Sequence, residues 1–113
     1  MANSFKNKKV DLTTTDLTTL YTVPTATTTV VKSILVSDDS GSGTTIDVTL
    51  VNSSSAIFNL FKSKSISGNA TTELLTQPLV MEESEVLKVQ SGYANRLHVV
   101  ASILEIQPRE VTT

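Results

Sequence analysis

The sequence predicts an all-β domain, specifically a two-sheet antiparallel β-sandwich of about eight strands. Three observations predict this fold: apolar residues recur at every second position, turn-forming clusters separate the apolar runs, and Thr and Ser make up about 28% of the chain. Thr suits a half-buried pleated surface, whereas Ser favours turns. Short strands at regular spacing are typical of a sandwich or barrel. Both a jelly-roll and an immunoglobulin-like strand order fit this pattern.

The first long strand is expected at residues 28–37. The alternation there assigns Val30, Ile34 and Val36 to one face and Val31 and Leu35 to the other. A period of two with apolar residues on at least one face predicts a strand that packs on the core.

Two further long strands are expected at residues 44–52 and 96–106. The first alternates apolar and polar side chains, which predicts one buried and one exposed face. The second has Leu97, Val99, Ala101 and Ile103 on one face and His98, Val100, Ser102, Leu104 and Ile106 on the other. Apolar residues on both faces predict a central strand, or one that a neighbouring subunit covers.

Six shorter segments complete the expected strands: residues 9–12, 18–23, 57–62, 73–75, 79–81 and 85–90. Turn chemistry separates the strands at residues 23–24, 38–43, 53–55, 67–69 and 91–93. Residues 1–8 lack periodicity and are expected to form an N-terminal arm. One sandwich domain then covers residues 9–107, and Pro108 ends the last strand and begins a C-terminal tail at residues 108–113.

The composition restricts the kinds of partner. A net charge of −2 and a pI near 5.2 provide no basic surface for nucleic acid or anionic lipid, and the apolar stretches are too short to span a bilayer. The chain has no cysteine, which excludes disulfides and thiolate metal sites. Aromatic residues make up 4% of the chain, so the core must consist of Val, Ile and Leu. A partner subunit often completes such a core.

No group of residues has the spacing of a catalytic or metal site. His98 is the one histidine of the chain and lies in an alternating strand, so we expect it to be structural. Glu82, Glu83 and Glu85 are residue types that catalyse proton transfer or bind a hard cation, but the flanking alternation favours a hairpin tip. Residues 38–43 lack the spacing of a calcium or phosphate loop and favour a hairpin connection. We expect no enzymatic activity, no cofactor and no metal.

The candidate partner contacts are Phe5, Lys6, Lys8, Lys9 and Tyr93. The first four lie in or next to the expected arm, which could dock on a neighbouring subunit. The alternatives are a solvated arm or lysines that protect a sheet edge from aggregation. Tyr93 lies in a Gly-containing loop and is the best candidate for an aromatic platform that binds a sugar.

Five runs of the sequence carry a resemblance to a known group of proteins. They are residues 20–24 (LYTVP), 27–36 (TTTVVKSILV), 79–82 (LVME), 85–89 (EVLKV) and 101–106 (ASILEI). From about Val10 to Ile106, the chain resembles small β-sandwich virion structural proteins of tailed bacteriophages, especially marine and cyanobacterial ones. The resemblance rests on packing and turn patterns.

The resemblance implies a non-enzymatic component of the virion that is made in the host cytoplasm. Its most concrete form is a capsid decoration or cement protein that stabilises the head by bridging neighbouring subunits. The implied partners are further copies of the chain, in a homo-oligomer for which a trimer is one option, and the major capsid protein or another virion protein, but neither nucleic acid nor membrane. The alternatives are a neck, tail or baseplate component, or a module that binds a host-surface glycan or receptor.

Overall fold

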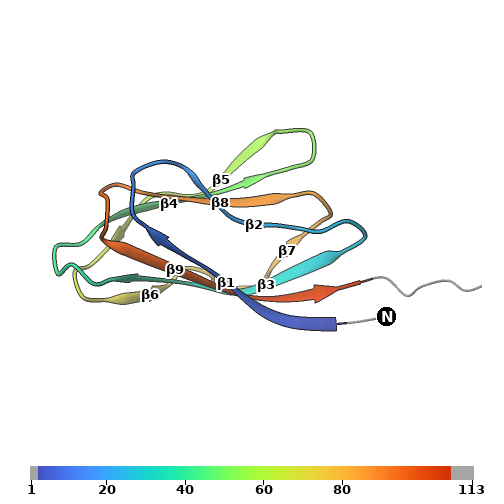
Figure 1. The fold of residues 1–113 in the computed structure, drawn as a ribbon, viewed down its shortest axis with the longest axis horizontal. Coiled ribbons are helices and arrows are strands. Elements are labelled where there is room, and N and C mark those ends of the chain that lie inside the picture. Colours follow the sequence, from blue (N-terminus) through green and yellow to red (C-terminus); the bar gives the residue numbers. More distant parts are fainter. Residues whose placement is uncertain (1–2, 108–113) are drawn as a thin grey trace, which may run out of the picture.

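The computed structural model describes residues 3–107, which form nine strands in two antiparallel sheets packed face to face as a sandwich (Figure 1). The five-stranded sheet has the order β1-β9-β3-β6, with β7 also paired to β3, and the four-stranded sheet has the order β2-β8-β4-β5. The strands are β1 Asn3–Leu12, β2 Thr18–Thr22, β3 Thr28–Asp38, β4 Thr44–Val51, β5 Ile57–Ile66, β6 Thr71–Glu73, β7 Leu79–Met81, β8 Val86–Ser91 and β9 Leu97–Ile106. The predicted all-β sandwich is therefore confirmed.

The strand order is that of a jelly roll. The chain passes from one sheet to the other between β1 and β2, β2 and β3, β3 and β4, β5 and β6, β7 and β8, and β8 and β9. Strands β6 and β7 pair with opposite ends of β3 and act as two halves of one strand, which leaves the eight strands of two Greek keys. In an immunoglobulin sandwich the first two strands share a sheet, whereas here they lie in different sheets.

The core between the sheets consists mainly of aliphatic side chains, as the composition predicts. Its largest fully buried members are Leu12, Ile34, Ile46, Met81, Leu87, Leu97 and Ile103. Tyr21 is the buried aromatic residue of this core. Strand β9 lies between β1 and β3 and contributes Leu97, Val99, Ala101 and Ile103. The prediction of a central strand is confirmed, and its second face is open to solvent.

The expected N-terminal arm is wrong for residues 3–8, because these residues form the first part of β1. Strand β1 pairs with β9 at every position from Asn3 opposite Ile106 to Leu12 opposite Leu97. Leu12 is the one side chain of β1 that is buried. Backbone hydrogen bonds to β9 therefore hold the first half of the strand. Because such bonds do not require apolar side chains at every second position, the sequence carries no periodic signal for this part of β1. Residues 1–2 and the expected tail at 108–113 lie outside the described residues.

A β-bulge in β3 changes which residues share a face. The pairing of β3 with β9 shifts between Val31 and Ser33. Strict alternation predicts Val30 on the same face as Ile34 and Val36, but Val30 lies on the opposite, outer face while Ile34 and Val36 are fully buried. One inserted residue reverses the alternation of every side chain after it.

Two connections expected to be hairpins instead cross between the sheets. Residues 39–43 join β3 to β4, and residues 82–85 join β7 to β8, with the two strands in different sheets in each case. The expected turns are present: Ser84 has a positive φ of 68°, and the Glu85 N–H donates to the Glu82 carbonyl over 3.1 Å. Within residues 3–107, β4 and β5 are the one pair of consecutive strands joined as a hairpin. No helix in this part of the chain is long and apolar enough to cross a membrane.

Candidate interaction surfaces

The outer face of the five-stranded sheet carries a row of apolar side chains. Directly opposite residues of paired strands point to the same face. Phe5 pairs with Leu104, Leu104 pairs with Val30, and Val30 pairs with Val80. These four side chains therefore lie in one line across the sheet. We call this line the outer apolar row.

The outer apolar row is accessible to solvent. Phe5 is 73% exposed and Val80 is 56% exposed at the two edges, whereas Leu104 and Val30 are half-buried between them. The ammonium group of Lys32 lies 5.7 Å from the centre of the Phe5 ring. Singly exposed apolar side chains are ordinary, but a continuous row across a sheet is the usual mark of an interaction surface.

A second row on the same face combines apolar and charged residues. Lys9 pairs with Val100, Val100 with Leu35 and Leu35 with Glu73. The row therefore has a lysine at the β1 edge, a glutamate at the β6 edge and two apolar residues between. Next to it, between β1 and β9, lies a hollow of about 280 Å³ lined by Lys9, Val10, Asp11, His98, Val99 and Val100.

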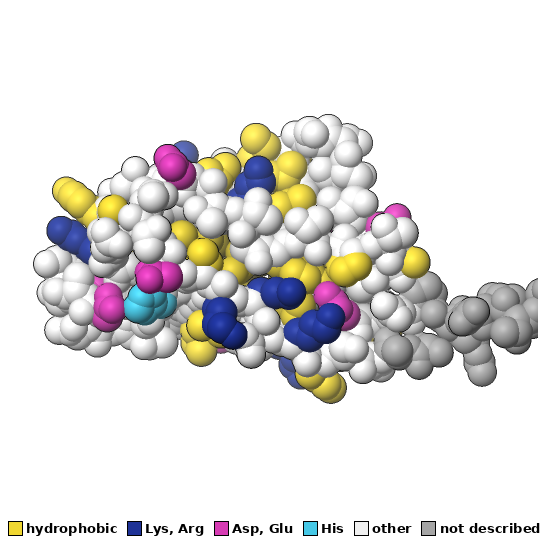
Figure 2. Space-filling view, in the orientation of Figure 1, with side chains coloured by type: hydrophobic (Ala, Val, Ile, Leu, Met, Phe, Trp, Pro, Cys, Tyr) yellow, Lys and Arg dark blue, Asp and Glu magenta, His cyan; other side chains and the backbone are white. Residues whose placement is uncertain are grey.

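The β4–β5 hairpin carries a separate apolar surface on the other sheet. Figure 1 shows the hairpin rising away from the rest of the four-stranded sheet, and Figure 2 shows hydrophobic side chains gathered over β5. Ile57 is 65% exposed and Phe58 is 50% exposed; they pair with Val51 and Leu50 and lie on opposite faces of the hairpin. No charged residue occurs between Asp47 and Lys62. We call Ile57 and Phe58 the hairpin tip.

Of the predicted partner contacts on β1, Phe5 and Lys9 lie on the outer face of the sheet, where Lys9 Nζ donates to Asn7 Oδ1 over 3.1 Å, whereas Lys6 and Lys8 lie on the inner face. The ammonium group of Lys6 lies 2.9 Å from Glu105 Oε1, and that of Lys8 lies 5.8 Å from the centre of the Tyr21 ring. Lysines on an edge strand are also a common protection against strand-to-strand aggregation. The four residues therefore do not form one continuous docking patch.

Glu105 belongs to a buried polar network at the margin of the core. The Tyr21 hydroxyl donates to Glu105 Oε2 over 2.6 Å and lies 2.7 Å from Thr29 Oγ1. The hydrogen bond from Tyr21 and the contact with Lys6 lower the pKa of Glu105, against the effect of its burial. Burial and the hydrogen bond to Glu105 raise the pKa of Tyr21. Sequence reasoning missed this pair, although a glutamate amid Ile103, Leu104 and Ile106 was a usable signal.

Tyr93 lies far from Phe5, in the loop between β8 and β9 at the other end of β9 (Figure 1). The side chain is 58% exposed, and the guanidinium carbon of Arg96 lies 4.1 Å from the ring centre, over one ring face. Arg96 Nη1 also donates to the Gly43 carbonyl over 2.9 Å. The structure therefore presents Tyr93 as a ring with one face covered by a cation.

The aspartate-containing loop after β3 is held by its own hydrogen bonds. Asp38 is buried, and its Oδ1 accepts the backbone N–H groups of Ser40 and Gly41 over 2.8 and 2.9 Å. Burial opposes ionisation, but these bonds, with those from the Ser40 hydroxyl and the Asn69 N–H, lower the pKa of Asp38. The carboxylate thus stabilises a turn.

His98 lies beside acidic side chains at the same end of the sandwich (Figure 2). Its Nε2 atom lies 3.2 Å from Asp11 Oδ1 and 3.8 Å from Asp39 Oδ2.

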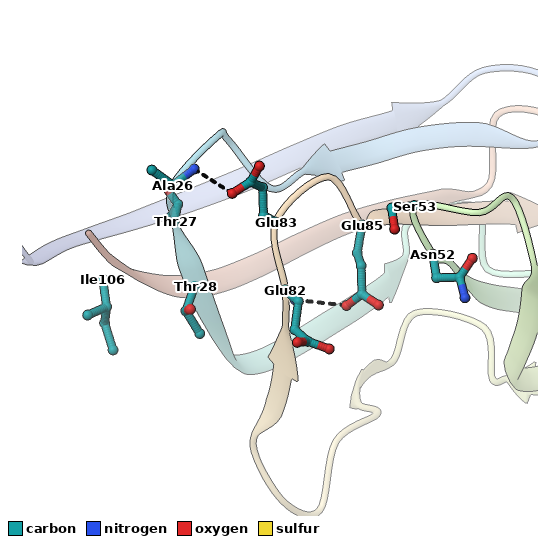
Figure 3. Close-up of a pocket in the computed structure, with 9 residues that line it drawn as sticks. All are labelled: Ala26, Thr27, Thr28, Asn52, Ser53, Glu82, Glu83, Glu85 and Ile106. Carbon is teal, nitrogen blue, oxygen red and sulfur yellow. Dashed lines mark hydrogen bonds between the residues drawn. The ribbon is translucent and has the colours of Figure 1, made fainter. Parts of the chain in front are cut away.

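The acidic cluster lines an open hollow of about 600 Å³ at the opposite end of the sandwich (Figure 3). Glu83 Oε1 accepts the Ala26 N–H over 2.9 Å, and Glu85 Oε1 accepts the Glu82 N–H over 2.8 Å. Figure 3 shows the Glu85 carboxylate directed at the backbone of its own loop and the Glu83 carboxylate directed at the neighbouring loop between β2 and β3. In the part of the chain that the structure describes, no three acidic or histidine side chains are arranged to hold a metal ion.

No protein-family model matches this chain, and no curated protein matches it.

Proposed function

We propose that this chain is a non-enzymatic structural protein of a virus particle, most concretely a capsid decoration or cement protein that bridges neighbouring head subunits. The hairpin tip carries this proposal. Two large apolar side chains lie at the end of a projecting hairpin, where Ile57 is 65% exposed and Phe58 is 50% exposed. The surrounding segment is uncharged from Val48 to Phe61, and depletion of charge is characteristic of interface cores. The resemblance of the sequence to small β-sandwich virion proteins supplies the kind of partner.

The mechanism is adhesion. Covering the exposed parts of Ile57 and Phe58 contributes about 2–3 kcal/mol to each contact, from the hydrophobic free energy of burying such side chains. That contribution is weak for one contact, but repetition over a symmetric shell strengthens attachment by avidity. The outer apolar row lies on the opposite sheet, so that one molecule presents two apolar surfaces that face in different directions.

Co-sedimentation with heads assembled without this chain tests the proposal. We expect the wild-type protein to bind saturably and the double variant Ile57→Ser, Phe58→Ser to lose at least about 30-fold in affinity, which corresponds to about 2 kcal/mol. The matched control is Leu17→Ser, which removes an apolar residue that is 46% exposed in the β1–β2 loop. Binding to tails instead of heads would move the protein to the neck, tail or baseplate. Absence of binding to any virion part would refute the proposal.

A second candidate function is recognition of a host-surface glycan, and the exposed Tyr93 ring favours it. Aromatic rings contribute large contact areas to binding sites, and Arg96 fixes the orientation of this one. If this function is the right one, Tyr93→Ala abolishes binding to host cells and leaves head binding intact. Equal cell binding by wild type and Tyr93→Ala removes this candidate.

A further inference from the structure

We propose that a second copy of this chain covers the outer face of the five-stranded sheet, in a two-fold symmetric dimer with the two sheets packed face to face. The proposed axis lies in the interface, runs parallel to the strands and passes between β9 and β3. Such an axis exchanges the two edges of the sheet. It places β1 of one copy opposite β6 and β7 of the other, and β9 opposite β3.

The outer apolar row is complementary to itself under this symmetry. Phe5 of one copy meets the partner's Val80, and Leu104 meets the partner's Val30, because these pairs occupy matching positions about the axis. Each copy thus covers the two most exposed side chains of the row with apolar partners. Packed sheets keep their strand directions within about 30° of each other, so facing rows stay together near the axis.

The second row is complementary in charge and in shape. The axis places Lys9 of each copy opposite the partner's Glu73, which forms two cross-dimer ion pairs at opposite edges. The Glu73 carboxylate is fixed in position, because its Oε2 accepts the N–H groups of Ile34 and Leu75 over 2.9 and 3.1 Å. Leu35, 38% exposed, meets the partner's Val100 beside the 280 Å³ hollow. Opposite charges at matching positions on one face favour a second copy over an unrelated partner.

The size of the face suits a dimer interface. Four strand positions spaced by about 4.8 Å and ten residues at about 3.4 Å each give a flat projection of about 650 Å². Side chains enlarge the accessible area above that projection, toward the roughly 800 Å² that each partner contributes to a standard interface. The hairpin tips of the two copies then lie on the far sheets, directed away from each other. Dimerisation through this face is independent of the proposed function and turns one chain into a bivalent unit.

Molar mass and cross-linking test the dimer directly. We expect light scattering to give twice the chain mass of 12.1 kDa, and Val80→Glu to raise the dissociation constant at least 50-fold, because it places an unpaired carboxylate in the interface. The control Ile57→Glu puts the same charge on the hairpin tip and leaves the dimer unchanged. Circular dichroism confirms that both variants are folded.

A carbodiimide, which joins an amine directly to a carboxylate, tests the orientation in a mixture of ¹⁴N- and ¹⁵N-labelled wild-type chains. The expected product is a Lys9–Glu73 cross-link between differently labelled chains. A monomer at every concentration, a trimeric mass, or a dimer that lacks this cross-link and tolerates Val80→Glu would overturn the proposal. Because no head is present in either experiment, failure of the dimer and failure of capsid binding are distinguishable.

Discussion

Removing one hydroxyl group, by Tyr21→Phe, tests the account of the buried polar network. The hydroxyl donates to a buried carboxylate, Glu105, over 2.6 Å and contacts Thr29 Oγ1 at 2.7 Å. A hydrogen bond to a charged group contributes about 1.5–3 kcal/mol, and a buried partner left without a bond adds to the loss. The phenyl ring fills the same space, so no cavity forms. We expect a loss of about 2–3 kcal/mol in the free energy of unfolding.

Urea and thermal denaturation followed by circular dichroism measure this loss. At neutral pH the melting temperature should fall by roughly 8–12 °C, since a domain of this size loses about 4 °C per kcal/mol. The matched control is Tyr93→Phe, which removes the hydroxyl of an exposed tyrosine and keeps the ring beside Arg96. The control should change stability by less than about 0.5 kcal/mol.

The pH dependence gives a second test of the same network. The pKa of Glu105 is lowered in the folded state, so its stabilising effect is complete above the ordinary glutamate pKa and is lost as the pH falls through the lower, folded-state pKa. Below that pH the bond from Tyr21 joins two neutral groups and contributes about 1 kcal/mol. The deficit of Tyr21→Phe should therefore shrink on acidification. A deficit below about 0.5 kcal/mol at pH 7, or one that does not change with pH, would refute the reasoning.

Three further predictions concern the strand ends and loops. Deletion of residues 1–8 should destabilise the domain by at least about 2 kcal/mol in urea denaturation, because it leaves the Glu105 carboxylate without its lysine and removes half of a strand; a true arm would be dispensable. Gly43→Ala should lower the melting temperature clearly, since Gly43 has φ of 70° and a Cβ there would lie 2.7 Å from the Ile66 carbonyl oxygen; an unchanged melting temperature contradicts that geometry. Asp38→Ala should speed amide hydrogen exchange in the loop after β3, and Asp38→Asn should do so less, because an amide oxygen still accepts.

The sequence predicted most strands, because side-chain burial with a period of two dictates them. β9 is the clearest case, since its apolar residues on both faces correctly predicted a central position. Strand β1 was hidden because backbone pairing, and not side-chain burial, holds its first half. The bulge after Val31 was also hidden, and it separates Val30 from Ile34 and Val36, with which the alternation predicted a shared face.

The surfaces were harder to predict than the strands. The outer apolar row brings together Phe5, Val30, Val80 and Leu104, which come from four strands and become neighbours only through the pairing register. Local sequence does not contain that register, nor the contact of Tyr21 with Glu105 across 84 residues. Phe5, Lys6, Lys8 and Lys9 were predicted together as partner contacts, and the sequence could not separate Lys6 and Lys8, which contact Glu105 and Tyr21, because their strand was expected to be an arm.

Calorimetry of heads, with and without the bound protein, tests the central claim most directly. If the chain is a cement protein, heads that carry the wild-type chain unfold at a higher temperature than heads assembled without it. Heads incubated with the Ile57→Ser, Phe58→Ser variant unfold at the temperature of undecorated heads. A head melting temperature that stays the same when wild-type protein is demonstrably bound would contradict the account.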